Sequence, residues 1–395
     1  MKVLHVIPSV ASWRGGPSMA MRAIAAGLAA QGLDIHVATT DDNKPSRLDV
    51  PLREPVEKDG AIYHYFRRQT RFYICSAPLS TWLWRSAREF DIIHIHTVFS
   101  YCSNAAAWIA CRKGVPYIIR PLGVLNRWGL ENRRPFLKRL SFAVLEKRLL
   151  SRAAAVQYTT EQEREEASDL GFPHRSVVIP NPVPLADAGS VPRGQLRTRY
   201  PALAGRRIVL FLSRIDRKKG LDLLLPAFAE VLRECPDAAL VIAGEGNAQL
   251  VDRLRHLSSR LGINAAVFWA GFLSGKNRDA AFADADIFVL PSYSENFGMA
   301  PVEAMGFGLP VVLTDKVGIH REVNSERAGI VVPPSAPSLA SALVLLLRDE
   351  GLRLEMGRNA SRLVAARYSV EAVTGRLTEL YLQLCPQPEA ARVRG

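Results

Sequence analysis

The stretch that decides the fold of this chain is residues 286–305, which read DIFVLPSYSENFGMAPVEAM. Its first five residues form an apolar run typical of a buried strand, and Ala300–Met305 can begin a helix after the intervening loop. Open α/β sheets place ligand groups in such loops, at the carboxyl ends of strands. We therefore expect Glu295 at the loop tip and Glu303 one or two helical turns further on. Two fixed carboxylates of this kind accept hydrogen bonds from the hydroxyls of a sugar or ribose.

The same succession of strand, loop and helix repeats along the whole chain. Short apolar runs alternate with amphipathic helices, which predicts parallel sheets built from βαβ units. The run Ile179–Pro184 carries three prolines and favours an extended linker between two domains. The predicted strands cover residues 3–7, 35–39, 62–66, 92–96, 117–120, 154–158 and 177–179 before this linker, and 208–212, 239–243, 267–269, 287–290, 311–313 and 330–332 after it.

Composition describes an ordinary globular protein of 395 residues, 48% of them hydrophobic. The 5 cysteines are scattered and never form a C-x-x-C pair, which indicates neither a disulfide framework nor a zinc site and favours a reducing compartment. The apolar run near the N-terminus, residues 3–8, is too short for a signal peptide. No stretch approaches the ~20 apolar residues of a membrane span. We expect a cytoplasmic protein.

Positive charge is concentrated in one segment, although the whole chain carries a net charge of +13. Residues 120–152 hold nine basic and two acidic side chains, with apolar residues between them. Such a segment favours anionic lipid surfaces or polyphosphate ligands, which would make the protein peripheral on the inner face of the cell membrane. The same field attracts nucleic acid, and a solvated helix face is the ordinary alternative.

A candidate phosphate site follows the first strand after the linker. Residues 210–221, LFLSRIDRKKGL, run off the end of that strand into a helix. Arg214 sits at the strand end and Lys219 near the first helical turn, where unpaired N–H groups add a partial positive charge. Both cations can hold a diphosphate and stabilise it as it leaves. The alternative is an ordinary basic loop.

A glycine-containing loop follows the first strand of the chain. Gly15 and Gly16 permit close approach of a ligand to the backbone, and Pro17 suits the start of a helix. The pattern is not G-x-G-x-x-G, so it does not indicate dinucleotide binding. It is consistent with a second phosphate or sugar contact, or with a merely flexible loop.

Taken together, these motifs resemble glycosyltransferase family 4, a family of retaining enzymes with the GT-B fold. The resemblance covers the whole chain and is densest from about Arg207 to Tyr368. It rests on the order and spacing of Arg214 with Lys219, Gly244-Glu245-Gly246, Pro291-Ser292, Glu295 with Glu303, and Gly308-Leu309-Pro310-Val311-Val312. It implies two Rossmann-like, doubly wound domains, 1–182 and 183–365, facing a central cleft, with a C-terminal helix, 366–395, that returns to the first domain. The family also implies that the terminal helices from about Leu352 to Leu384 pack across that domain.

The resemblance also implies roles for individual residues. Arg214 and Lys219 would bind the diphosphate of a nucleotide sugar, Glu303 the ribose, and Glu295 would face the transferred sugar. Arg214, Lys219 and Glu295 are thus the expected catalytic set. The expected donor-binding set consists of Arg214, Lys219 and Glu303 together with Gly15, Gly16, Gly244, Phe272, Leu273, Phe297, Gly298 and Met299. Transfer would retain the anomeric configuration, with the leaving phosphate taking the acceptor's proton and with no metal or cofactor beyond the nucleotide sugar.

One departure from the family lies after strand 117–120. Many members carry a histidine in this loop, whereas residues 120–125 read RPLGVL. Arg120, together with His96 at the end of the preceding strand, is the candidate for the acceptor or sugar side. Members with a similar Pro-x-Gly-x-Leu loop resemble enzymes of polysaccharide assembly. Asp284-Ala285-Asp286 matches the D-x-D metal signature of another glycosyltransferase fold, but we interpret it as a helix end and a strand start.

The sequence therefore predicts a metal-independent glycosyltransferase of the hexosyltransferase type. Its donor would be a nucleotide diphosphate sugar, with UDP favoured, and its acceptor a saccharide or lipid-linked molecule in cell-surface or exopolysaccharide assembly. A nucleotide-sugar epimerase or hydrolase of the same fold would use the same phosphate groups. A basic nucleic-acid-binding protein is the alternative from another class, but the clustering of the basic residues argues against it, and we expect no nucleic acid partner.

Overall fold

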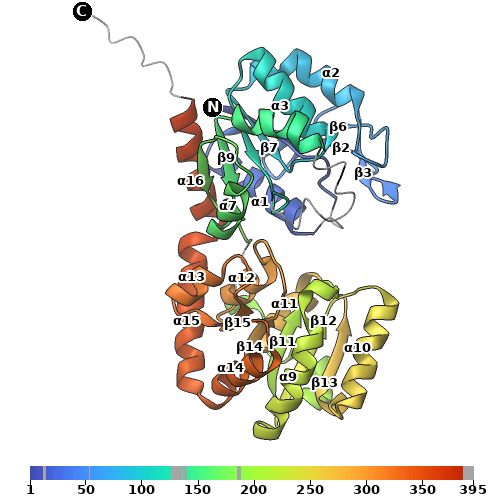
Figure 1. Cartoon of the computed structure of the whole chain (residues 1–395), viewed down its shortest axis with the longest axis vertical. Helices are drawn as coiled ribbons and strands as arrows, with labels where there is room; N and C mark the ends of the chain where they lie inside the picture. The colour runs from blue at the N-terminus through green and yellow to red at the C-terminus, as the bar shows by residue number, and fades with distance from the viewer. Residues whose placement is uncertain (12–14, 53, 126–135, 137–139, 185–187, 386–395) are drawn as a thin grey trace, which may run out of the picture. The chain divides into compact units, whose positions relative to one another are not determined.

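The computed structural model describes residues 1–11, 15–52, 54–125, 136, 140–184 and 188–385. The chain divides into two units, the first made of Met1–Pro182 with Val370–Gly395 and the second of Val183–Ser369 (Figure 1). The sequence placed boundaries at 182 and 365, so the second division falls four residues later than expected. No helix in the described ranges is long and apolar enough to cross a membrane.

The first unit is built on an eight-stranded sheet in the order β10-β9-β8-β7-β1-β2-β6-β5. All neighbouring pairs are parallel except β5 with β6, which are antiparallel. The strands are β1 (Lys2–Val6), β2 (Asp34–Thr40), β5 (Val56–Lys58), β6 (Ala61–Phe66), β7 (Ile92–His96), β8 (Tyr117–Arg120), β9 (Ala155–Tyr158) and β10 (Ser176–Val178), with a separate hairpin of β3 (Asp42–Asn43) and β4 (Ser46–Arg47). The short strands β3, β4 and β5 lack the long apolar runs on which the sequence prediction relied.

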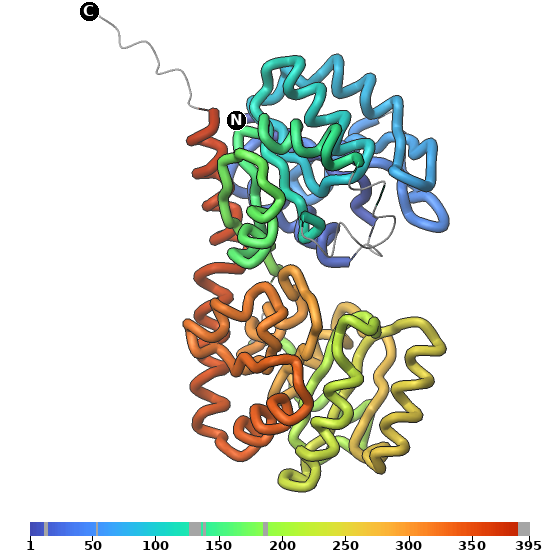
Figure 2. Tube along the Cα trace, viewed as in Figure 1, coloured from blue at the N-terminus to red at the C-terminus, as the bar shows by residue number. Residues whose placement is uncertain are grey.

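Helices cover both faces of this sheet, as the alternating pattern predicted. They are α1 (Gly16–Ala30), α2 (Ala77–Ser86), α3 (Tyr101–Lys113), α6 (Lys147–Ser151), α7 (Glu161–Ser168) and α16 (Val370–Leu384). The C-terminal helix α16 packs beside α1, and Figure 2 shows its red trace returning to this unit. Gln31 Nε2 donates to Thr374 Oγ1 across this contact at 2.7 Å. One apolar core therefore includes residues of both β1 and α16.

The second unit holds a six-stranded, fully parallel sheet in the order β13-β12-β11-β14-β15-β16. The strands are β11 (Arg207–Leu212), β12 (Ala238–Ala243), β13 (Val267–Gly271), β14 (Ile287–Leu290), β15 (Val311–Thr314) and β16 (Gly329–Val332). Strand order reverses between β11 and β14, because the chain first builds outward to β13 and then returns to the other side of β11. Such a switch point opens a crevice outside the carboxyl ends of the strands.

Helices flank this second sheet as well. They are α8 (Gln195–Arg199), α9 (Leu221–Glu234), α10 (Ala248–Arg260), α11 (Gly275–Asp284), α12 (Met299–Gly306), α13 (His320–Ser325), α14 (Ala336–Arg348) and α15 (Glu350–Arg367). The expectation that the terminal helices from Leu352 onward all pack on the first domain is wrong for α15. This helix packs against α12 within the second unit, and only α16 joins the first. The predicted α/β class with two Rossmann-like parallel sheets is confirmed.

Candidate active site

The two motifs that the sequence singled out meet at the switch point of the second unit. Residues 213–220 follow β11 and residues 291–298 follow β14, and these strands are neighbours. The backbone N–H of Tyr293 donates to the carbonyl of Lys218 at 2.8 Å, which fastens one loop to the other. Gly220 has a φ of +72°, and a Cβ atom there would lie 1.9 Å from the carbonyl oxygen of Pro291. Only glycine allows the two loops to approach this closely.

Lys219 and Glu295 form an ion pair across these loops. Lys219 closes a 3-10 turn, Arg217–Lys219, directly before α9 and is 7% exposed. The backbone of Glu295 is fixed by two hydrogen bonds. Its N–H donates to the carbonyl of Lys316 at 2.9 Å, and its carbonyl accepts from the N–H of Gly318 at 2.8 Å. An ammonium and a carboxylate are thus fixed side by side at the carboxyl edge of the sheet.

Two further cations surround this pair. Arg214 is exposed at the end of β11, as predicted, and Lys218 is half-buried beside Lys219. Burial lowers the pKa of Lys218; the carboxylate of Glu295 opposes this shift, while Lys219 and Arg214 reinforce it. Mutual repulsion among these cations favours binding of an anion. Sequence reasoning did not select Lys218, although the run of three basic residues before Gly220 was a visible signal.

Glu303 lies on the second turn of α12 and is 8% exposed. Its Oε1 accepts a hydrogen bond from Arg278 Nη1 on α11 at 2.9 Å. Burial raises the pKa of Glu303, while the positive charge of Arg278 lowers it. Arg278 was not among the predicted site residues, because nothing in its neighbourhood marks it as different from a surface arginine of a helix.

The other predicted donor residues lie in the loops at the same edge of this sheet. Gly244 follows β12 with a φ of +146°, and a Cβ there would lie 1.9 Å from the carbonyl oxygen of Ser213. Phe272, after β13, is 68% exposed, whereas Leu273 is buried. Gly298 is the N-cap of α12, at the base of the loop that carries Glu295. Phe297 beside it is buried against Tyr368, and Met299 is the first residue of the helix.

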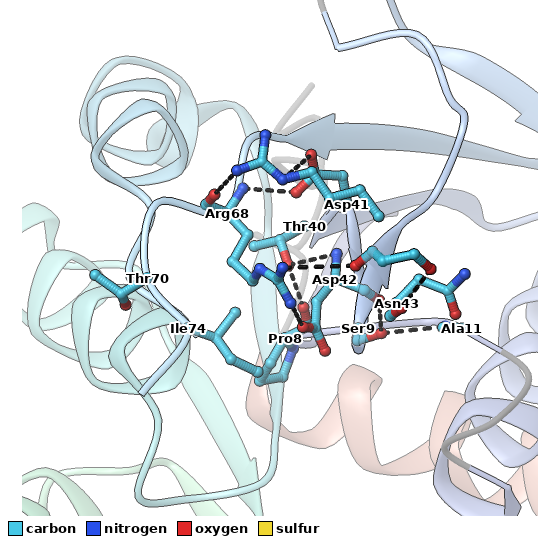
Figure 3. A network of polar contacts seen from close by, with 12 residues as sticks. Pro8, Ser9, Ala11, Thr40, Asp41, Asp42, Asn43, Arg68, Thr70 and Ile74 are labelled. Carbon is cyan, nitrogen blue, oxygen red and sulfur yellow. Dashed lines mark hydrogen bonds and ion pairs between the residues drawn. The ribbon is translucent and has the colours of Figure 1, made fainter. Parts of the chain in front are cut away.

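The predicted glycine loop lies at the corresponding place in the first unit, between β1 and α1. Gly15 is the N-cap of α1 with a φ of +68°, and Gly16 is the first helical residue. The strand end that leads into this loop is held by a buried polar network (Figure 3). Ser9 Oγ donates to the carbonyl of Asp42 at 2.6 Å, and Asp42 forms a buried ion pair with Arg68. This network anchors residues 8–11 below the loop.

The acceptor-side candidates His96 and Arg120 belong to a different buried cluster in the first unit. Both are 0% exposed, and Arg120 Nη1 lies 3.5 Å from His96 Nδ1. His96 Nε2 in turn lies 3.0 Å from His5 Nδ1, and His94 Nδ1 lies 2.7 Å from the hydroxyl of Tyr381. These side chains therefore contact one another beneath α16, and their role toward an acceptor stays a prediction.

Ring nitrogens of His5, His94 and His96 lie within 4.8 Å of one another, a spacing that could hold a metal ion. The sequence gave no sign of this cluster, because His5 is remote in the chain from the other two. Burial lowers the pKa of His5 to about 3 and the pKa values of His94 and His96 well below the usual range. The guanidinium of Arg120 donates toward His96 Nδ1, which places the ring proton of His96 on Nε2, facing His5. A positive charge and this tautomer both disfavour a divalent cation there.

Backbone strain marks the carboxyl ends of the neighbouring strands β7 and β8. Thr97 has a φ of +73° and Phe99 a φ of +55°, directly after β7, and Leu122 has a φ of +60° after β8. Left-handed conformations of such residues are unfavourable, and they concentrate at functional sites. These loops are thus candidates for ligand binding. The sequence analysis singled out the loop after β8 by its family position, but not the strained backbone, because dihedral angles leave no pattern in side-chain identity.

The carboxylates of Asp284 and Asp286 have structural partners. Asp284 ends α11 and accepts from the backbone N–H of Leu196 at 2.7 Å, and Asp286 accepts from that of Ile208 at 2.7 Å. Both contacts fix the start of β14. This geometry agrees with the interpretation of the D-x-D pattern as a helix end and a strand start.

Each of the two units matches a known protein family. Residues 193–363 match the family described as Glycosyl transferases group 1, and residues 15–182 match the Glycosyl transferase 4-like domain. The D-inositol 3-phosphate glycosyltransferase of Corynebacterium jeikeium is 30% identical over 75% of this chain and 73% of its own length. The alpha-D-kanosaminyltransferase of Streptomyces kanamyceticus is 33% identical over 60% of this chain, but the match spans only 63% of that protein.

Solved structures agree over nearly the full length. The sucrose-phosphate synthase of Thermosynechococcus elongatus has a TM-score of 0.74 at 22% identity, covering 97% of this chain and 99% of that one. Anabaena HepE in complex with UDP has a TM-score of 0.77 at 20% identity, covering 97% and 100%. The fold and the family matches together define a glycosyltransferase of the GT-B fold. The chain belongs to the group 1 glycosyl transferases, with a 4-like domain as its first unit.

Proposed function

We propose that this glycosyltransferase moves a hexose from a nucleotide diphosphate sugar, with UDP as the favoured nucleotide, to a saccharide or lipid-linked acceptor in cell-surface or exopolysaccharide assembly. The observation that carries this proposal is the convergence of Arg214, Lys218 and Lys219 with Glu295 at the switch point, with Glu303 on helix α12, which follows the loop that carries Glu295. The cations match a diphosphate, and the carboxylates match the hydroxyls on either side of it.

The chemistry follows from where charge develops during transfer. Breaking the bond between the anomeric carbon and phosphate leaves negative charge on the diphosphate, and fixed cations stabilise that charge most when water is excluded. Lys219 is already buried and oriented by Glu295, so it needs little reorganisation to meet the phosphate. Glu295 then faces the sugar side. The reaction proposed is metal-independent and retains configuration, with the leaving phosphate accepting the acceptor's proton.

Known relatives support the donor class. Anabaena HepE has been solved with UDP and with UDP-glucose, and other relatives are named for D-inositol 3-phosphate and phosphatidyl-myo-inositol. We infer a UDP-sugar donor and a hydroxyl-bearing acceptor for this chain. Gly15 and Gly16, at the switch point of the first unit, remain the predicted second contact to the donor.

A thermal-shift panel of UDP, GDP, ADP and their sugars tests the proposal first, because a ligand that binds only the folded state raises the midpoint. Incubation with the preferred donor alone, followed by NMR of the sugar, then separates transfer from its rivals. Accumulation of an epimer, or release of free sugar at a rate no acceptor changes, would replace transferase by epimerase or hydrolase. A duplex DNA titration across salt tests the nucleic-acid alternative, since real binding is steeply salt-dependent.

We also propose peripheral binding to an anionic membrane. Phe136, Leu140 and Val144 are spaced four residues apart and are 75%, 52% and 68% exposed. The basic residues predicted to join them, Arg133, Arg134, Lys138 and Arg139, lie outside the described residues. The double variant L140S/V144S should sediment less with phosphatidylglycerol vesicles than the wild type. The matched control L345S/L354S alters two exposed leucines of the second unit and should sediment unchanged.

A further inference from the structure

The contact between Arg278 and Glu303 joins a residue of no assigned role to the expected ribose carboxylate. The two side chains come from separate helices, α11 and α12, and are 24% and 9% exposed. Arg278 Nη1 donates to Glu303 Oε1 at 2.9 Å. Within the described part of the chain this is the sole polar contact of the Glu303 carboxylate, so Oε2 keeps its capacity to accept.

Arg278 is also the positive charge that acts on Glu303. Burial raises the pKa of Glu303, Arg278 lowers it, and Asp279, the neighbour of Arg278 on α11, raises it. Strands β14 and β15 beneath α12 carry no ionisable side chain. Helix α15 contacts α12 through Ser361, whose hydroxyl donates to the carbonyl of Met305. The ionised form of Glu303 therefore depends on one cation, which is itself shared with Asp279 at 3.5 Å.

We propose that Arg278 is a positioning residue for the ribose contact. It binds Glu303 Oε1, keeps the carboxylate charged in its buried position, and leaves Oε2 to accept a ribose hydroxyl. A protonated Glu303 would instead present an O–H donor and lose acceptor capacity. The inference rests on the proposed function, because it assumes that Glu303 meets the ribose of a nucleotide.

The test is nucleotide binding by isothermal titration between pH 6 and pH 9. Wild type is first titrated with UDP, GDP and ADP, and the tightest of the three is used for every variant. The variants are R278M, which keeps length but removes the charge, R278K, which restores a charge, and E303Q, which fixes position 303 as neutral. The matched control is K276M, which removes an exposed cation from the same helix two residues away. Ratios to wild type cancel the ionisation of the phosphate itself.

R278M should match wild type at high pH and bind progressively more weakly than wild type as the pH falls, because the burial that raises the pKa of Glu303 is then no longer opposed by the charge of Arg278. R278K should recover most of this loss, K276M should follow wild type, and E303Q should be weak with a ratio to wild type independent of pH. The loss in R278M should shrink when the 2′-deoxy nucleotide replaces the ribonucleotide.

Different outcomes overturn different claims. A pH-independent ratio for R278M, or an equal loss with the 2′-deoxy nucleotide, would overturn the role of Arg278 while nucleotide binding by wild type stood. If wild type bound none of the three nucleotides, the proposed function and this inference would both fall. Circular dichroism of R278K and R278M at each pH separates a binding defect from loss of fold.

Discussion

The two units share a Rossmann-like architecture but place their charged and titratable groups in opposite ways. In the first unit, His5, His94, His96 and Arg120 are all 0% exposed and face one another beneath α16. In the second, Arg214, Lys218, Lys219 and Glu295 stand at the loop edge of the sheet, each partly open or paired across a loop. The same fold therefore carries a sealed polar cluster in one copy and a loop edge with three basic side chains in the other.

This difference predicts which property of each unit a substitution or a pH change should affect. A buried neutral histidine resists protonation, so the free energy of unfolding of its unit depends on pH. The Lys219–Glu295 ion pair lies at a loop edge, where one partner can be exchanged for a ligand. Because its side chains are only 9% and 18% exposed, loss of one partner also lowers stability. We expect stability changes to follow the first unit and activity changes to follow the second.

The largest expected effect is acid unfolding of the first unit. The folded pKa of His5, about 3, lies below its unfolded value of 6.5, and those of His94 and His96 are also lowered. Stability from these groups is therefore complete above about pH 6.5 and is lost as pH falls from there toward 3. Each histidine costs about 1.4 kcal/mol per pH unit, so the three together remove ~4 kcal/mol by about pH 5.5.

Tryptophan fluorescence can follow this unit separately. Five of the six tryptophans lie in residues 1–182, and Trp269 is the sixth. The urea midpoint of W269F should be much lower at pH 5.5 than at pH 7.5. Adding H5Q should reduce by about one the number of protons taken up on unfolding at pH 5.5. Equal midpoints at both pH values would break the comparison between the units.

The next largest effect should be on turnover. Glu295→Gln removes a charge from the sugar side and should lower kcat by about two to three orders of magnitude, the range for losing one group that stabilises a transition state. Because the substitution also frees Lys219 from its ion pair, the affinity for UDP should stay equal or increase. The control is Glu230→Gln on α9, an exposed carboxylate away from these loops. Wild-type turnover in the Glu295 variant would remove that residue from the catalytic set.

Lys219→Ala should act on binding, and it should also cost some stability because it leaves the Glu295 carboxylate unpaired. It should weaken binding of the nucleoside diphosphate by about 1.5–3 kcal/mol, as expected for a hydrogen bond to a charged group. The monophosphate should lose less, since it lacks the second phosphate. Lys316→Ala, an exposed lysine in the adjoining loop, serves as the matched control. An unchanged isotherm with UDP would contradict the prediction that residues 213–220, after β11, bind the diphosphate.

The sequence predicted the second unit better than the first, for a physical reason. Strand and helix periods revealed both sheets. Arg214, Lys219 and Glu295 could be selected because each lies in a segment between a strand and the helix that follows it, and Glu303 because it lies on the helix after such a loop. Adjacent strands bring such loops together. Lys218 and Arg278 escaped selection because their role depends on which neighbours face them.

The polar cluster of the first unit could not be predicted in the same way. His94 and His96 share one face of a strand, but His5, Arg120 and Tyr381 reach them only through sheet order and the return of α16. The end of the second unit was misplaced for a related reason. Helices α15 and α16 are nearly continuous in sequence, and only packing assigns one to each unit.

The smallest expected effect is the loss of stability when one buried hydrogen bond is removed from each unit. Tyr381→Phe removes the hydroxyl bonded to His94 in the first unit, and Thr314→Val removes the hydroxyl that donates to the carbonyl of Ser292 in the second. Each should lower the stability of its own unit by about 1 kcal/mol, the usual net worth of a buried hydrogen bond. Tyr381→Phe should shift the tryptophan-detected transition of W269F and leave UDP affinity unchanged. Thr314→Val should weaken UDP binding slightly, because Ser292 begins the loop that carries Glu295. If Tyr381→Phe altered UDP affinity as strongly as Lys219→Ala, the sealed cluster would be part of the donor site and the division between the units would fail.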